Sequence, residues 1–350
     1  MKTDMHYYGV YALARAAGMR EKPAEIVATA SEYVDDAIWD KEVFLEDGRS
    51  VIAELTAHRL LDFKNADNED QRKVWLPFHF LPGGSGKTST DKLLCQKNSR
   101  IAKTMVMQNT EIATEAPYGL YIMGITAHVY ADTFAHYGFM GANHSYNAIR
   151  AGSIDLQVSD DGILDYIQKK AKHFLKEAVS YGLSQTFPLG HGAATTYPDR
   201  PYLRWSYIRE TDGKTVEREN PKDYVAACKA MHEMFGACLD KAPKLAESGT
   251  ARRWKDIRNT VKKIIELEGD KQVRIRGWKD AMHDNHLFGG STKVPRYKGS
   301  RWSSSIDDLE PEKIPRDMDK LPVYRFYQAA RIHRAHVLSN LLPPNDVIAA

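Results

Sequence analysis

Cysteine is scarce in this sequence. Only three cysteines, Cys95, Cys228 and Cys238, occur among the 350 residues, and no two of them have the CxxC spacing of a zinc or redox site. An odd number of widely spaced cysteines is also not typical of a disulfide framework. We therefore expect free, buried thiols in a protein of a reducing compartment.

Long hydrophobic runs are lacking as well. No stretch approaches the roughly 20 apolar residues that span a bilayer. Near the N-terminus, Asp4, His6 and Arg15 interrupt the apolar segment that a secretory signal peptide needs. We expect no transmembrane segment and a cytoplasmic location. The alternative is secretion by a machinery that requires no cleaved signal.

The sequence has little excess charge of either sign. A net charge of +3 is too small to indicate a nucleic-acid or membrane partner. Hydrophobic residues make up 43% and charged residues 27%, as in ordinary globular proteins. A chain of this length can bury a sizeable core without disulfides. These values exclude disorder throughout the chain.

Helical patterns dominate the rest of the sequence, so the predicted fold class is mainly α. A hairpin is expected at residues 43–55, with Asp47 and Gly48 in the turn. The remaining polar or glycine-rich segments, 63–73, 184–204 and 283–320, are predicted to be loops. The expected helices cover residues 7–17, 23–34, 117–138, 163–181, 221–240, 251–268 and 323–342.

The predicted organisation has two parts. Residues 1–210 would form a helical metal-binding core, because most candidate ligands lie there. Residues 211–350 would form a helical, loop-rich extension packed on the core. No clear linker separates the two parts, so a single continuous domain is the alternative.

The strongest chemical signal is the segment GITAHVYADTFAHYGFMGANH at residues 124–144. His128, Asp132 and His136 follow one another at intervals of four residues, which places them in one stripe about 12 Å long on a helix. Imidazole nitrogens and carboxylate oxygens bind zinc and related metals. The stripe could hold more than one metal, with Asp132 as a bridge. The alternative is a satisfied polar network or an exposed helix face.

Similar residues occur in other apolar or glycine-containing segments. Taken singly, each is more often structural than functional, because an Asp at a helix end or a His in a core is common. Together with the helical stripe they would supply enough ligands for about two or three metals. These residues are His6, Asp35, Asp36, His79, His191 and Asp199.

These segments, in this order, resemble a bacterial family with HYY, YVDD, HxxAD and GHxxxxxxPD motifs. The matching segments here are HYY at 6–8, EYVDD at 32–36, HVYADTFAH at 128–136 and GHGAATTYPD at 190–199. YLRW at 202–205 also looks like the family. The resemblance covers roughly the first 205 residues.

The pattern is similar in outline to the zinc-dependent phospholipase C and single-strand nuclease superfamily. This resemblance implies a multi-helix bundle with long loops and a cluster of three zinc ions. It makes Asp35 the alternative to Asp36 as a ligand. The amino group of a mature N-terminus binds metal in that superfamily, but this chain shows no cleavage site, so we count no such ligand. The implied ligands are His6, Asp36, His79, His128, Asp132, His136, His191 and Asp199.

The chemistry expected from this set is metal-dependent hydrolysis, with a phosphodiester or phospholipid-like substrate. Asp132 and Asp36 would bridge metals and orient the attacking water, and Arg204 or Arg200 would stabilise phosphate charge. Zinc is the expected metal, with manganese and iron as alternatives that accept the same ligands. The sequence does not choose among a lipid, a nucleic acid and a small phosphate ester.

Two other functions remain open. A phosphohydrolase of the HD type needs adjacent His and Asp on a helix, and His283–Asp284 is such a pair. Alternatively, the chain is a non-enzymatic protein, toxin-like, effector-like or a binding protein with a protein partner, whose metal is structural. The excess of candidate ligands over the four of a closed structural site favours an enzyme.

Overall fold

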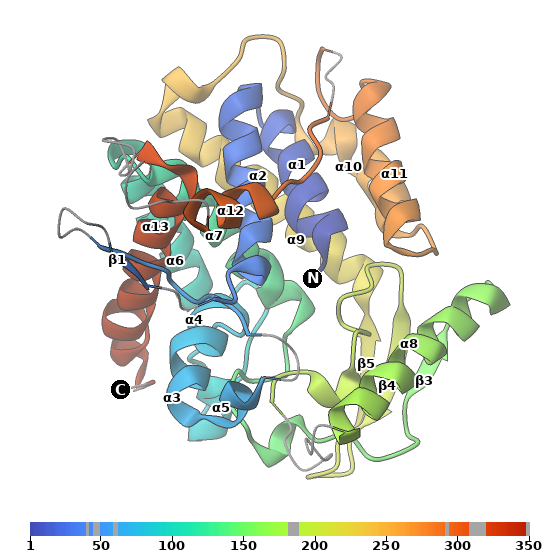
Figure 1. Ribbon diagram of the computed structural model, residues 1–350. Coiled ribbons are helices and arrows are strands. Elements are labelled where there is room, and N and C mark those ends of the chain that lie inside the picture. The colour runs from blue at the N-terminus through green and yellow to red at the C-terminus, as the bar shows by residue number, and fades with distance from the viewer. Residues whose placement is uncertain are drawn as a thin grey trace.

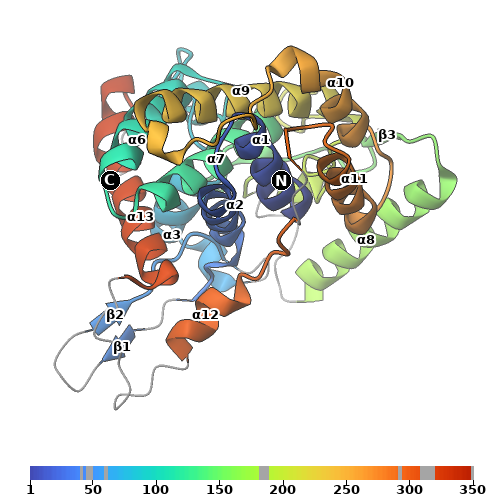
Figure 2. The same ribbon diagram turned by 90° about the horizontal axis from the view of Figure 1, so that it is seen from above.

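The computed structural model describes residues 1–39, 42–44, 50–58, 62–180, 189–290, 294–307 and 320–347. In these residues the chain is mainly helical, which confirms the predicted class. Figures 1 and 2 show helices gathered around a central group, with a small sheet and α8 to one side. The more specific likeness to a phospholipase C or nuclease bundle stays a prediction. None of the described helices combines the length and the apolar character needed to cross a membrane.

The N-terminal third begins with helices close to those predicted. A π-helix at Asp4–Gly9 runs into α1, Val10–Ala16, and α2 spans Glu21–Asp36. Gly18 follows α1 with φ of +107°, a conformation that favours glycine, and so helps to end the helix. The predicted start of α2 at Pro23 is two residues late, because Pro23 lies inside its first turn.

The central helix is α7, Gly119–Ala135. All its residues except Leu120 are buried, because α2, α6, α9 and α13 pack around it. A helix that is apolar on every face is stable only in such an environment. The predicted helix of 117–138 is therefore confirmed, although it ends earlier and leaves His136 at the C-cap.

Most other predicted helices are confirmed. Two further helices were not predicted. They are α6, Arg100–Glu115, and α11, Lys271–His283, and both are rich in polar residues. The helices near the predicted positions are α8 at Asp161–Ser180, α9 at Asn220–Lys241, α10 at Trp254–Ile265, and α13 at Pro322–His336 with a π-helix at Val337–Leu341.

The prediction of a loop at residues 63–73 is wrong. Three short helical segments cover this region and a fourth follows it, because Asp62 and Asp67 accept hydrogen bonds from backbone N–H groups and cap two of them. The segments are a 3-10 helix at Phe63–Ala66, α3 at Asn68–Asp70, a π-helix at Gln71–Trp75 and α4 at Leu76–Phe78. They lead directly into His79.

The hairpin is confirmed, and a sheet was missed. Strands β1, Glu42–Phe44, and β2, Ser50–Ile52, pair antiparallel, whereas Asp47 and Gly48 lie outside the described residues. A second, three-stranded antiparallel sheet has the order β3-β4-β5. Its strands are β3 at Asp155–Gln157, β4 at Arg204–Ile208 and β5 at Thr215–Glu219.

Two predicted loops contain short helices. In the first, residues 189–203 are irregular apart from a 3-10 turn at Gly192–Ala194, and residues 181–188 lie outside the described part. In the second predicted loop, residues 283–320, α12 spans Ser300–Asp307. Residues 291–293 and 308–319 of this loop lie outside the described part. The remaining short helices are α5 at Ser89–Leu93 and 3-10 turns at Ser145–Asn147, Pro243–Leu245 and Pro343–Asn345.

One large hydrophobic core joins both halves of the chain. It includes side chains from Met1 through Val347 and therefore crosses the boundary predicted at residue 210, although the division itself stays a prediction. A smaller core, with Trp205 and Tyr207, lies beneath the three-stranded sheet. All three cysteines are buried and free, as expected.

The close packing of α2 against α7 depends on Gly124. A Cβ atom at this position would lie 2.4 Å from the Val27 carbonyl oxygen and 2.6 Å from Ala30 Cβ. Such distances are too short for any real contact, and backbone atoms move little. The absence of a side chain therefore lets α2 lie against α7, with Asp35 near the end of the contact.

We predict that Gly124→Ala lowers the free energy of unfolding by about 2 kcal/mol, because the added methyl group forces the two helices apart. Gly236→Ala in α9 is the matched control, since a Cβ there has no atom within 4 Å. That change should be neutral or stabilise the protein by up to about 1 kcal/mol. Chemical denaturation measures both, and equal effects of the two changes would contradict this account of the contact.

Candidate metal centre

The helical stripe predicted from the sequence forms one buried group. His128 Nε2 lies 3.3 Å from one oxygen of Asp132, Oδ2, and His136 Nδ1 lies 3.5 Å from the same oxygen. All three residues are at most 3% exposed. Their four-residue spacing in α7 places them together, as the sequence indicated.

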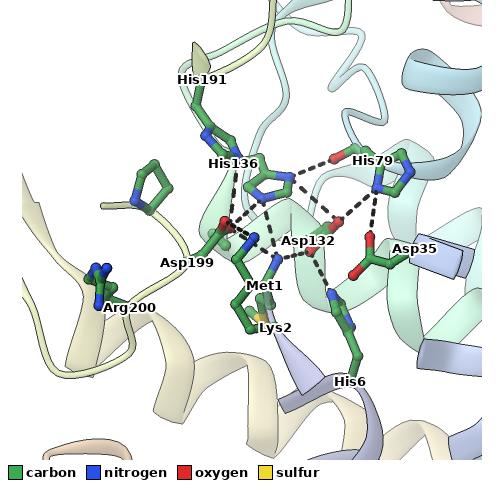
Figure 3. Close-up of polar contacts among 12 residues, drawn as sticks. Met1, Lys2, His6, Asp35, His79, Asp132, His136, His191, Asp199 and Arg200 are labelled. Atoms are coloured by element: carbon green, nitrogen blue, oxygen red, sulfur yellow. Dashed lines mark hydrogen bonds and ion pairs between the residues drawn. The ribbon is translucent and has the colours of Figure 1, made fainter. Parts of the chain in front are cut away.

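Asp132 is the centre of a larger cluster (Figure 3). Its Oδ1 lies 2.9 Å from the amino group of Met1 and 3.2 Å from His6 Nε2. On the other side, its Oδ2 lies 3.5 Å from His79 Nδ1. Residues from the first helix, the α4 end and α7 thus converge on one carboxylate.

The structure distinguishes the two acidic residues at the end of α2. Asp35 Oδ1 lies 3.8 Å from His79 Nδ1 and 3.9 Å from His128 Nε2, so this carboxylate faces the cluster. Asp36 instead accepts a hydrogen bond of 2.5 Å from the Tyr297 hydroxyl. Consecutive helical residues point about 100° apart, so only one of them can face α7. Asp36, expected as ligand and catalytic residue, is replaced in this position by Asp35.

The glycine-rich loop brings His191 and Asp199 to the other end of the cluster. Asp199 Oδ1 lies 3.2 Å from His136 Nε2 and 3.7 Å from His191 Nε2. The eight-residue separation in sequence is bridged by the 3-10 turn at Gly192–Ala194, which folds the loop back on itself. The predicted pair therefore converges although it does not lie on a helix.

Backbone carbonyl groups fix the orientation of four histidine rings in the cluster. A carbonyl oxygen can only accept, so the ring nitrogen facing it must carry the proton. The donors are His128 Nδ1 to Ser31 at 2.8 Å, His136 Nδ1 to His79 at 2.9 Å, His79 Nε2 to Thr56 at 2.8 Å and His191 Nδ1 to Thr195 at 2.8 Å. In each ring, the opposite nitrogen faces the cluster.

These orientations bring lone pairs together. His128 Nε2 and His79 Nδ1 lie 3.3 Å apart, and in neutral rings both are acceptors. The nearest oxygen of Asp132 is an acceptor as well. Acceptors at this distance repel each other unless a cation lies between them, either a proton or a metal ion. Metal-binding histidines typically donate their other nitrogen to a carbonyl or carboxylate, as these do.

Three sets of ligand atoms have the spacing that a metal ion needs. Within each set, the donor atoms lie within 4.8 Å of one another. Two of the sets share His128, and the third adjoins them where His136 Nδ1 lies 3.5 Å from Asp132 Oδ2. The sets are His6, Asp35 and His128; His79, His128 and Asp132; and His136, His191 and Asp199.

The amino group of Met1 occupies the middle of the cluster and was not among the predicted residues. It lies 3.2 Å from Asp199 Oδ1 in addition to its contact with Asp132. Burial alone would lower the pKa of this amine, but the two carboxylates raise it to about 10. The ammonium group therefore joins the two ends of the cluster electrostatically. In the sequence analysis, a role for the N-terminal amino group was suggested only by the resemblance to the phospholipase C and nuclease superfamily.

The protonation states suit metal binding. Burial, together with the neighbouring His128, lowers the pKa of His6 to about 3, and burial lowers that of His191 to about 3 despite Asp199. Burial by itself raises the pKa of Asp132, but the surrounding histidines and the Met1 amine hold it well below the usual range. Neutral imidazoles and ionised carboxylates are the forms that bind metals.

Three other residues in the sequence hypotheses lie outside the cluster. Arg204, predicted to be catalytic, is 49% exposed on β4 and lies 3.5 Å from Glu266 rather than at the cluster. Side chains alternate along a strand, and this one faces outward. His283 and Asp284 are exposed at the end of α11 and contact each other, which gives the HD-type alternative no buried site there.

We predict that the purified protein contains at least one divalent metal for each chain, and that Asp132→Asn reduces this content by about tenfold or more, because the central carboxylate charge is lost. His283→Ala, which alters an exposed histidine outside the cluster, should leave the content unchanged. Elemental mass spectrometry measures the metals, and circular dichroism checks that each variant is folded. Equal metal content in Asp132→Asn and the wild type would contradict the assignment.

One comparison with known proteins gives a match. The model of a family described as a family of unknown function (DUF6765) matches residues 1–341. No curated protein and no solved structure matches the chain. The matched segment includes every residue of the cluster. The chain therefore belongs to the DUF6765 family.

Proposed function

We propose that this protein is a metal-dependent hydrolase of phosphoric esters. The observation that carries the proposal is the arrangement of four histidines, each donating one ring nitrogen to a backbone carbonyl and directing the other into a buried set of carboxylates. A structural polar network would pair donors with acceptors. Between His79 Nδ1, His128 Nε2 and Asp132 Oδ2, acceptors face acceptors, which favours a site for cations.

The ligand number favours catalysis over a purely structural metal. Structural zinc sites are closed by four protein ligands. The three contiguous sets here draw on more ligands than one such site uses. Asp35 is also 36% exposed, so one edge of the cluster is accessible to a substrate. A binding protein with a structural metal is the second candidate, and the activity test below decides between them.

Each residue in the cluster has a distinct role in the proposed reaction. A divalent metal acts as a Lewis acid and lowers the pKa of water, which supplies a nucleophile near neutral pH. The histidines hold the metals, and Asp132 lies between the two ends. Asp35, the accessible carboxylate, takes the role that the sequence gave to Asp36 and accepts the proton of the attacking water.

A phosphoric ester fits the site better than a neutral ester or amide. Adjacent divalent ions stabilise the attacking and leaving oxygens of a phosphoryl group. Lys2, whose Nζ lies 3.1 Å from Asp199 Oδ2, brings a further positive charge to the edge of the cluster. The resemblance to the zinc-dependent phospholipase C and nuclease superfamily supports the same class. Zinc is the proposed metal, and the cytoplasmic location stays a prediction.

We predict that the protein hydrolyses the chromogenic diester bis(4-nitrophenyl) phosphate, that EDTA abolishes the activity and that zinc restores it. Asp35→Asn should lower kcat by about 100-fold, since a positioned general base contributes on the order of 10²–10⁴-fold, while most of the metal is retained. Asp36→Asn is the matched control next to it in sequence and should retain activity. Metal-loaded protein without activity on this diester or on a panel of phosphomonoesters would support the structural-metal alternative.

A further inference from the structure

A pocket opens beside the Asp199 end of the cluster. Its volume is about 360 Å³, near the lower end of the range for small-molecule sites. Residues of α8 and α11 line the pocket, and Figures 1 and 2 show both helices on the same side of the N-terminus. Asp199 belongs to the pocket wall and to the cluster, so the two sites share a border.

Basic side chains dominate the lining of this pocket. They are Lys2, Lys170, Arg200, Lys271 and Arg274, and the carboxylate of Asp199 is the acidic group among the lining residues. Two of these cations already have partners, because Lys2 contacts Asp199 and Arg274 contacts Asp4 at 2.6 Å. Lys170, Arg200 and Lys271 have no carboxylate within ion-pair distance in the described part of the chain.

Arg200 is the most informative of the three. Arg200 is only 7% exposed, and its Nε has no hydrogen-bond partner among the described residues. The other guanidinium nitrogens reach only neutral groups, the hydroxyls of Thr196 at 3.2 Å and Tyr202 at 3.5 Å. A buried charge without a counter-ion is costly, so its retention here points to an anionic ligand.

The position of Arg200 separates it from the metal-binding atoms. Figure 3 shows it on the same loop as Asp199, on the side away from Asp132. Asp199 directs Oδ1 toward His136 and Oδ2 toward Lys2. A phosphate bound at Arg200 would therefore lie beside the cluster rather than on it.

We propose that this pocket binds a second phosphate group of the substrate, next to the phosphoric ester that the cluster cleaves. Guanidinium and ammonium groups are the usual protein ligands for phosphate. Lys170, Arg200 and Lys271, which have no carboxylate within ion-pair distance among the described residues, can together neutralise the two negative charges of a phosphomonoester. The substrate class is thus a phosphodiester that carries a terminal phosphate. This inference rests on the proposed function for the identity of the cleaved bond.

Two chromogenic substrates test the pocket through kinetics. Thymidine 5′-(4-nitrophenyl phosphate) and its 3′-phosphorylated form differ only in the second phosphate. For the wild type, we expect the 3′-phosphate to lower KM about 10- to 100-fold with little change in kcat. Arg200→Gln should remove this advantage by raising the KM for the 3′-phosphorylated substrate. Arg204→Gln, four residues away on β4, is the matched control and should retain it.

Binding of inorganic phosphate provides a readout independent of activity. Isothermal titration calorimetry on the purified protein should give a site that Arg200→Gln and Lys170→Gln each weaken about tenfold or more, and that Arg204→Gln leaves unchanged. Lys170 is exposed, so its variant avoids the risk that a buried substitution disturbs folding.

The outcomes separate this inference from the proposed function. If the wild type hydrolyses both thymidine substrates with equal KM, the function holds and the second-phosphate site is wrong. If it hydrolyses neither of them, nor bis(4-nitrophenyl) phosphate or the phosphomonoester panel, the proposed function fails, and phosphate titration alone decides whether the pocket binds phosphate. Phosphate binding that is equal in the wild type, Arg200→Gln and Lys170→Gln would overturn the pocket assignment.

Discussion

The buried carboxylate of Asp132 is the constraint on which the rest of the site depends. An ionised carboxylate that is 1% exposed is stable only with positive charge or hydrogen-bond donors around it. The Met1 amine and His6 surround one of its oxygens, and His79, His128 and His136 surround the other. The fold therefore brings the N-terminus, the end of α4 and the central helix to a single point.

The scaffold meets this constraint by enclosing α7 on all sides. Gly124 lets α2 lie close enough for the Ser31 carbonyl to orient His128 and for Asp35 to reach the cluster. On the opposite side, the loop that carries Asp199 returns toward the end of α7. Beyond it, Arg200 lies in a separate basic pocket. The accessible carboxylate of Asp35, the candidate metal ligands around Asp132 and the basic pocket at Arg200 thus follow one another from one end of the cluster to the other (Figure 3).

The parts of this site that depend on local geometry could be predicted from the sequence. The stripe on α7 follows from four-residue spacing, and the burial of that helix follows from its apolar composition. The choice of Asp35 over Asp36 could not be predicted, because it depends on how α2 is rotated against α7. Long-range packing also determines the position of the Met1 amine and the separation of Arg200 from Arg204. The three-stranded sheet was missed because its strands are short and their pairing is non-local.

X-ray absorption spectroscopy at the metal edge of the purified protein tests the central claim most directly. The account predicts a first coordination shell of nitrogen and oxygen alone, with distances of about 2.0–2.2 Å for zinc and the multiple scattering that imidazole rings produce. A sulfur shell at about 2.3 Å would assign the metal to the buried cysteines instead. That result, or a protein that binds no metal under any condition, would contradict a metal centre around Asp132.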